Sequence, residues 1–267
     1  MELGDLPPPD PSTLHLPRLL MLHGGGTNSR IFHMQCRSLD YHLKAHFRTV
    51  FVEAPLPSTA GPDVLTVYAE CGPFKRWVLT TEPNAVERQP KETWDLDERA
   101  IADAMDADDR RGATGAWAGV LGFSQGGKMA ASVLLRQQEN PAALGRLRRP
   151  GSPGGFKFGV LMAGRGPLIQ PDPDSADWLG HDEKFDYESN LAAGRVLRVP
   201  TIHVHGMQDP GLDFHQVLLS EWCEPGTTKL IEWEGNHRLP FKTPDVGKVV
   251  NAIMDLARRE GVFSLKN

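Results

Sequence analysis

The sequence predicts an α/β fold in which a mostly parallel central sheet carries helices on both faces. Short apolar runs alternate along the chain with segments of helical spacing, which is the order that builds such a sheet. The runs are continuously apolar, as expected for strands that are buried on both faces. With 267 residues, 40% of them hydrophobic and 24% charged, the chain can bury one sizeable core, so we expect a single domain.

The expected elements begin at residue 18. Continuous apolar runs predict strands over Arg18–Leu22, Thr49–Val52, Ala118–Gly122, Phe158–Met162, Thr201–Val204 and Lys229–Trp233. Helical spacing of apolar residues predicts helices over Ser29–Phe47, Thr93–Ala107, Gln125–Gln138, Phe214–Glu224 and Pro244–Glu260.

Three segments fall outside this alternation. Residues 1–17 are rich in proline, which supports neither helix nor ladder hydrogen bonds, so we expect an extended lead-in there. Two connections, 56–92 and 163–199, are unusually long and are expected to be lid-like insertions in the domain formed by residues 18–267. Aromatic residues of these insertions are candidate walls of a substrate pocket: Phe74, Trp77 and Trp178.

Composition disfavours several classes of function. A net charge of −5 gives no reason to expect binding to nucleic acid or to anionic membranes. The cysteines Cys36, Cys71 and Cys223 are far apart, so neither a disulfide framework nor a zinc site is indicated, and a reducing cytoplasmic location is expected. No apolar run approaches the length of a membrane-spanning helix, and the first residues lack the pattern of a secretory signal.

The clearest chemical motif is Gly122-Phe123-Ser124-Gln125-Gly126, which lies between a predicted strand and a predicted helix. This context is the one that a nucleophile elbow requires, because the serine must sit on a strained turn while strand and helix approach closely at the two glycines. The alternative is a glycine-rich start of a helix in which Ser124 is only a capping residue.

A serine nucleophile needs a general base, and the base needs an acid that orients it. Asp209 follows the strand predicted over 201–204, and His237 follows the next strand along the chain. Both therefore lie at the carboxyl edge of the predicted sheet, where ligands bind in such folds. We expect His237 to be the base and Asp209 to be the acid.

Other residues in the same region compete for these roles. Asp213 is the rival acid, although its position at the start of a predicted helix also suits a capping role. His203 and His205 alternate along a predicted strand and are expected to be structural or to line the site. His215 lies inside a predicted helix, which is a poor position for a base that faces Ser124.

Attack on a carbonyl also needs N–H donors for the oxyanion. The backbone amide of Gln125 follows the nucleophile directly, and the second donor should come from the glycine run after the first strand. In that run Gly25 is the first choice and Gly26 the second. Its spacing matches neither of the common phosphate-binding loops, and the chemistry needs no metal and no organic cofactor.

Four segments together resemble the FSH-type family of serine hydrolases, which are α/β-hydrolases common in fungi. These segments are LLMLHGGGTNSRIF, VLGFSQGGKMAASVLL, PTIHVHGMQDP and WEGNHRLP, and the resemblance spans about residues 18–260. It implies the α/β-hydrolase fold with Ser124, Asp209 and His237 as a triad. The resemblance also implies an activity like that of the thioesterases and esterases in polyketide pathways of the lovastatin and citrinin type. Those enzymes release or edit acyl chains on a carrier protein.

We therefore expect an enzyme that hydrolyses an acyl thioester or ester, with a small-molecule substrate or one bound to the acyl carrier protein of a polyketide synthase. The resemblance alone favours the thioester. A general carboxylesterase is one alternative, and a non-catalytic ligand-binding protein of the same fold is another. An arginine cluster is a candidate docking patch for the carrier, with an ordinary solvated loop as the alternative: Arg146, Arg148 and Arg149.

Overall fold

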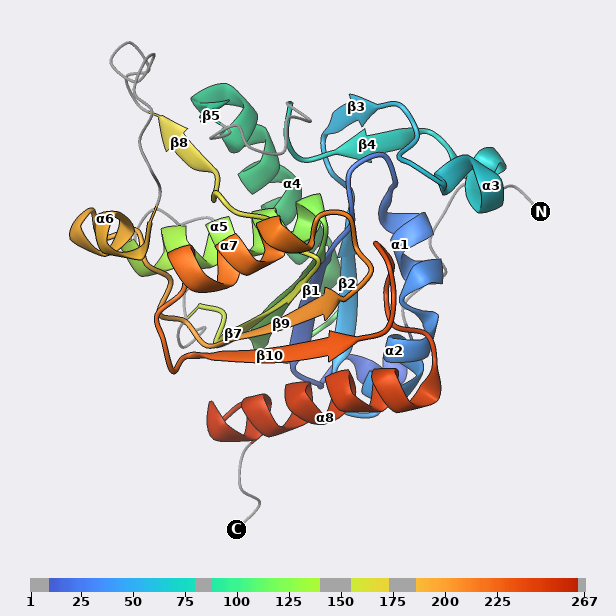
Figure 1. The fold of residues 1–267 in the computed structure, drawn as a ribbon. Coiled ribbons are helices and arrows are strands. Elements are labelled where there is room, and N and C mark those ends of the chain that lie inside the picture. The colour runs from blue at the N-terminus through green and yellow to red at the C-terminus, as the bar shows by residue number, and fades with distance from the viewer. Residues whose placement is uncertain (1–9, 80–87, 140–154, 173–185, 264–267) are drawn as a thin grey trace.

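The computed structural model describes residues 10–79, 88–139, 155–172 and 186–263 (Figure 1). A parallel sheet of six strands, in the order β10-β9-β7-β6-β1-β2, runs through its centre. The predicted α/β architecture is confirmed, and each strand ends within two residues of its expected position. The strands are β1 (Arg18–Leu22), β2 (Arg48–Val52), β6 (Trp117–Phe123), β7 (Phe158–Met162), β9 (Thr201–Gly206) and β10 (Thr228–Trp233).

The larger helices follow the predicted order, with one division. The helix expected over residues 29–47 is interrupted at Cys36, where φ is −80° and ψ is −1°, and its second part ends at Leu43. Within the described ranges, none of the helices is long and apolar enough to cross a membrane. The main helices are α1 (Ser29–Gln35), α2 (Arg37–Leu43), α4 (Lys91–Arg110), α5 (Gln125–Glu139), α7 (Leu212–Trp222) and α8 (Thr243–Arg259).

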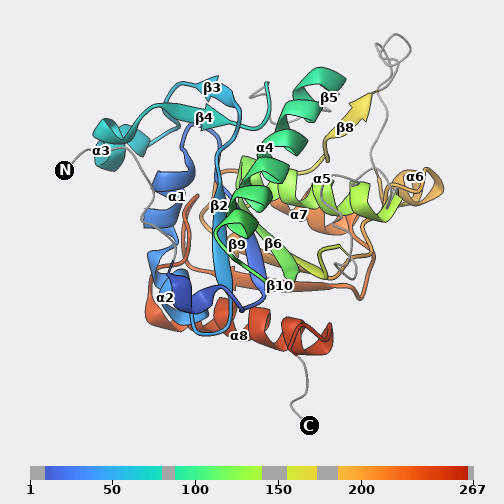
Figure 2. The same ribbon diagram turned by 180° about the vertical axis from the view of Figure 1, so that it is seen from behind.

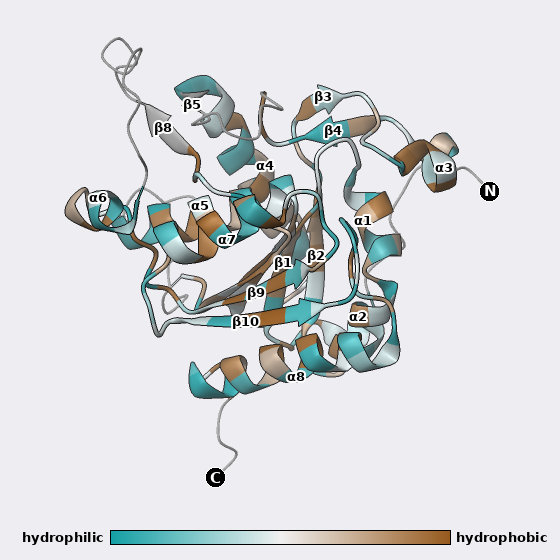
Figure 3. Cartoon of the chain, in the orientation of Figure 1, coloured by the Kyte–Doolittle hydropathy of each residue, from teal (hydrophilic) through white to brown (hydrophobic). Residues whose placement is uncertain are grey.

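The helices cover both faces of the sheet. Helices α1, α2 and α8 pack on one face, whereas α4, α5 and α7 pack on the other (Figures 1 and 2). Alternate residues of β1 therefore enter different cores: Leu19 and Met21 face α8, and Leu20 and Leu22 face α5. Figure 3 shows this burial on both faces: the inner strands are mostly hydrophobic, whereas the edge strand β10 is mixed. This double burial explains the continuous apolar runs.

The two long insertions have structure of their own and meet one another. The first contains the antiparallel pair β3 (Leu56–Ser58) and β4 (Phe74–Arg76), the short helix α3 (Val64–Tyr68) and the strand β5 (Arg88–Pro90). In the second insertion, β8 (Gln170–Asp172) pairs in parallel with β5, and the helix α6 (Tyr187–Ala192) follows. Because each insertion leaves the carboxyl end of a sheet strand, both lie at the edge where the site residues are expected.

The lead-in is not extended throughout. Its described part contains a 3₁₀ turn over Pro11–Thr13, and the Leu14 carbonyl accepts a hydrogen bond of 2.8 Å from the Thr114 amide. The Thr13 hydroxyl also accepts a hydrogen bond of 2.8 Å from Arg48. Residues 10–17 are therefore held against the amino ends of β1 and β2 by polar partners that proline content alone does not reveal.

A buried ionic cluster lies at these amino ends. Arg48 and Asp108 are 2% and 1% exposed and are joined at 2.6 Å, while Arg18 contacts both Asp108 and Asp109. Arg18 also lies over the ring of Trp117 at 4.2 Å. Two guanidinium groups thus depend on carboxylates at the end of α4, because an isolated buried charge costs several kcal/mol.

Replacement of Asp108 by Asn should destabilise the fold strongly. The variant leaves two buried arginines short of one negative charge, so the free energy of unfolding should fall by about 3–5 kcal/mol. Chemical denaturation followed by circular dichroism measures this change. The matched control is Asp255→Asn, which removes an exposed partner of Arg258 and should change stability by less than about 1 kcal/mol. Equal effects of the two substitutions would contradict a structural role for the cluster.

Candidate active site

Ser124 occupies a sharp turn between β6 and α5. Its φ is +55°, which is rare for a residue with a side chain, and its hydroxyl lies 2.9 Å from Nε2 of His237. A Cβ atom at Gly122 would lie 1.9 Å from the Gly126 carbonyl oxygen, and one at Gly126 would lie 2.1 Å from the Leu22 carbonyl oxygen. Both positions therefore exclude a side chain. A capping serine would instead bond to an amide of its own helix.

The structure brings together the three residues predicted to act as nucleophile, base and acid. Nδ1 of His237 lies 2.6 Å from Oδ2 of Asp209, and Nε2 of the same ring faces Ser124. Because a carboxylate only accepts, Nδ1 carries the proton and Nε2 is free to accept the serine proton. Asp213 lies in the first turn of α7, and the carboxylate that meets His237 is that of Asp209.

The environment of Asp209 keeps its carboxyl group ionised. Burial by itself would raise the pKa, but the contacts with His215 and His237 and the Gly211 amide, which donates at 2.8 Å to Oδ1, hold the pKa of Asp209 well below its usual range. The side chain is an acceptor on both oxygens. It therefore suits the fixing of one ring tautomer in His237.

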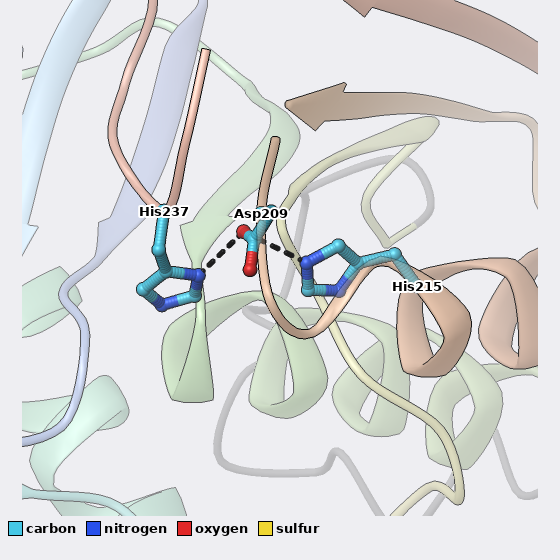
Figure 4. Close-up of side chains that lie close together, drawn as sticks. All are labelled: Asp209, His215 and His237. Carbon is cyan, nitrogen blue, oxygen red and sulfur yellow. Dashed lines mark hydrogen bonds and ion pairs between the residues drawn. The ribbon is translucent and has the colours of Figure 1, made fainter. Parts of the chain in front are cut away.

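His215 is the site residue that the sequence did not reveal. Figure 4 shows it on the opposite side of Asp209 from His237. Its Nε2 lies 3.0 Å from Oδ2 of Asp209 without the alignment of a hydrogen bond, and its ring is fully buried. One feature of the sequence could have indicated this contact: His215 lies in the first turns of a predicted helix. Helical side chains lean toward the amino end of their helix, which here is the turn that contains Asp209.

The two histidines of β9, His203 and His205, are core residues. Burial, as the main cause, lowers the pKa of His203 to about 3 and that of His205 to about 4, so both are neutral. Nε2 of His203 lies 3.1 Å from the Thr201 hydroxyl, and the His205 ring lies 5.6 Å from that of His215. Their positions agree with the structural or site-lining role expected for them.

Asp209, His215 and His237 are also the described side chains whose donor atoms lie within 4.8 Å of one another, a spacing that a metal ion could use. However, Oδ2 of Asp209 is already the acceptor for His237, and the other nitrogen of that ring faces Ser124. The arrangement therefore suits movement of a proton along the chain of hydrogen bonds.

The glycine loop after β1 runs beside the nucleophile, since a Cβ atom at Gly24 would lie 3.5 Å from Cβ of Ser124. The Gly26 amide donates to the Lys75 carbonyl oxygen at 2.8 Å and is therefore occupied. Among the described residues, the Gly25 amide has no acceptor. Of the two alternatives for the second oxyanion donor, Gly25 is thus favoured.

Two side chains hold this loop in place. His23, fully buried, donates from Nδ1 to the Gly24 carbonyl oxygen at 2.8 Å and accepts at Nε2 from the Ala54 amide at 3.0 Å. Burial, as the main cause, lowers the pKa of His23 and favours this neutral form. The Gln125 side chain fills the space over Gly25 and accepts a hydrogen bond of 3.2 Å from the Trp77 amide. Neither role is visible in the sequence.

The predicted aromatic walls have different outcomes. Phe74 is half-buried on β4, whose neighbour Lys75 pairs with the glycine loop. The prediction for Trp77 is wrong: its ring is fully buried in the core, and its indole N–H donates to the His23 carbonyl oxygen at 2.8 Å. The remaining predicted contacts lie outside the described residues: Trp178, and the arginine cluster of Arg146, Arg148 and Arg149.

A family model described as serine hydrolase (FSH1) matches residues 13–249 of the chain. The chain belongs to the FSH1 family of serine hydrolases. Among similar members, "Esterase pigG" of Monascus ruber is 51% identical over 264 residues, covering 95% of this chain and 96% of that protein. "Esterase citA" of Monascus ruber is 46% identical over 252 residues, covering 93% and 95%.

Solved structures agree on the fold of this FSH1 chain. A Bacillus cereus carboxylesterase matches with a TM-score of 0.51 at 15% identity, covering 90% of this chain and 89% of that one. Acyl-protein thioesterase 2 of Zea mays matches with a TM-score of 0.51 at 16% identity, covering 91% and 94%. The chain is thus a serine hydrolase with the α/β-hydrolase fold.

Replacement of Gly126 by Ala should damage both folding and the site. The added methyl group would meet the backbone oxygens of Leu22 and His23 at 2.1 and 2.5 Å, which no side-chain movement relieves. We expect a lower melting temperature and little hydrolase activity, measured by calorimetry and an acyl-ester assay. The control Gly247→Ala on α8 meets nothing within 4 Å and should keep both. Wild-type behaviour of Gly126→Ala would contradict the close strand–helix contact.

Proposed function

We propose that this chain hydrolyses an acyl ester or thioester through a covalent acyl-enzyme on Ser124. The observation that carries the proposal is the continuous chain from Oγ of Ser124 to His237 at 2.9 Å and on to Asp209 at 2.6 Å. This is the geometry in which a serine hydroxyl becomes a nucleophile. The relatives pigG and citA are named as esterases, which supports an ester-type bond as the target.

In the first step, Oγ of Ser124 bonds to the carbonyl carbon while its proton moves to Nε2 of His237. The amides of Gln125 and Gly25 donate to the oxyanion that develops on the carbonyl oxygen. The oxyanion then collapses, the bond to the leaving group breaks, and His237 gives its proton to the departing alcohol or thiol. The acyl group remains on Ser124.

In the second step, His237 takes a proton from water, whose oxygen attacks the acyl carbon. Collapse of the second oxyanion releases the acid, and the proton returns from His237 to Oγ of Ser124. Throughout, Asp209 holds the ring in one tautomer and stabilises its positive form. The reaction needs no resident cofactor.

For the substrate, we propose a polyketide acyl chain on an acyl carrier protein, released or edited in secondary metabolism. The support is the sequence resemblance, together with two paired insertions at the edge that holds Ser124. Phe74 is our proposed pocket wall in the described part of the chain. A cytoplasmic setting is part of the proposal, consistent with the free cysteines Cys36, Cys71 and Cys223.

A general carboxylesterase of small esters is the second candidate, favoured by the word esterase in the names of the relatives. A ligand-binding protein without catalysis is the third. It fits the site less well, because Ser124, Asp209 and His237 are already within hydrogen-bond distance, whereas a binding role needs no such alignment.

A fluorophosphonate probe should label Ser124 alone. The activated hydroxyl attacks phosphorus as it would attack a carbonyl carbon, so mass spectrometry should find the adduct on the peptide that contains Ser124. Ser124→Ala should abolish both labelling and turnover of a short acyl ester. Ser220→Ala, which removes an exposed hydroxyl bonded to Gln216 and Glu221, is the matched control. Labelling of another serine, or none in folded protein, would exclude the proposed mechanism.

A comparison of matched substrates should separate the candidates. If a carrier-bound acyl chain is the substrate, kcat/KM for a pantetheine thioester should exceed that for the oxygen ester of the same acyl group by about tenfold or more, a difference of about 1.4 kcal/mol in transition-state stabilisation. A preference for the oxygen ester would instead favour the general carboxylesterase.

A further inference from the structure

The carboxylate of Asp209 meets two imidazole rings rather than one. On one side lies His237, and on the other lies His215, fully buried in α7 with Nε2 3.0 Å from Oδ2. The two rings are stacked at 6.1 Å between centroids with an interplanar angle of 21° (Figure 4). A single carboxylate oxygen is therefore shared by both.

The partners of His215 determine how many protons it carries. Its Nδ1 lies 3.0 Å from the Gly164 carbonyl oxygen, which only accepts, so Nδ1 must be protonated. A neutral ring would then leave the lone pair of Nε2 about as close as a hydrogen bond, at 3.0 Å, to the anionic oxygen of Asp209. A second proton on Nε2 turns this repulsion into an ion pair inside the protein, where electrostatic interactions are strong.

Charged and titratable groups of neighbouring segments also lie near His215. His205 on β9, at 5.6 Å between ring centroids, is held neutral mainly by burial, which lowers its pKa to about 4. The loop after β7 contributes the Gly164 carbonyl and Arg165, whose guanidinium lies 5.7 Å from the Phe214 ring. Asp213 lies two residues earlier on α7. Among the described residues, Asp209 is the carboxylate within ion-pair distance of His215.

Resting on the proposed function, we propose that His215 is a positively charged positioning residue that neutralises Asp209 and supports His237. A lone carboxylate strongly favours the charged form of the ring beside it. A second positive ring at 6.1 Å opposes that form, so His237 is available as a neutral base at lower pH. His215 thus extends the pH range in which the enzyme is active to lower pH, without contacting the substrate.

The test is the pH profile of kcat/KM for His215→Gln, a variant that keeps a polar side chain and removes the charge. The pH at which half of kcat/KM is lost on the acid side should rise by about one unit, because His237 then faces an unpaired carboxylate. The matched control is His203→Gln, another buried histidine, whose ring contacts Thr201 and Cys223 and should leave this midpoint unchanged. Superimposable acid limbs in wild type and His215→Gln would overturn the proposal.

A measurement on the wild-type protein covers the case in which His215→Gln does not fold. Nitrogen-15 NMR of histidine-labelled enzyme at neutral pH should show both ring nitrogens of His215 protonated, while those of His203 and His205 report neutral rings. A neutral His215 would equally overturn the proposal. An error in the proposed triad would be recognised by a different result, because Ser124→Ala would then retain probe labelling and turnover.

Discussion

The hydrogen bond of 2.6 Å between Asp209 and His237 is the interaction on which the arrangement of the site depends. It requires two turns, 28 residues apart along the chain, to meet. Parallel pairing of β9 with β10 achieves this, because Gly206 stands opposite Trp233 and both strands end at the same edge. A Cβ atom at Gly206 would lie 2.6 Å from the Asn236 carbonyl oxygen, so the turns approach closely only with glycine there.

Charge is buried at both ends of the sheet, and each charge has a partner close by. At the amino ends, Asp108 is paired with Arg48 and Arg18, and at the carboxyl ends Asp209 is shared by two histidines. The inner strands between these ends are largely apolar on both faces, with Thr201, His203 and His205 of β9 as buried polar exceptions. Both of these charged groups therefore lie at strand ends, where backbone turns and neighbouring side chains supply partners.

The sequence predicted the six sheet strands because burial on both faces leaves a continuous apolar signal. It also predicted that Ser124, Asp209 and His237 would meet, because each follows a strand of one parallel sheet. It did not predict His215, whose contact depends on how α7 is oriented over the turn that precedes it. The error at Trp77 has a similar origin: an aromatic residue in a long insertion looks like a pocket wall, whereas its burial depends on packing against His23.

The first insertion and the proposed oxyanion site are mechanically linked. The backbone carbonyl oxygen of Lys75 accepts a hydrogen bond of 2.8 Å from the Gly26 amide, and the Lys75 amide donates one of 2.6 Å to the Thr27 carbonyl oxygen. Strand β4 therefore holds the glycine loop in place. The Trp77 amide also bonds to the Gln125 side chain that covers Gly25. A shift of this insertion would therefore move the glycine loop that contains Gly25, and the Gln125 side chain that covers it, relative to Ser124. It follows that substrate contacts in the insertion can change the rate of acylation as well as affinity, because they act on the loop that holds the developing charge.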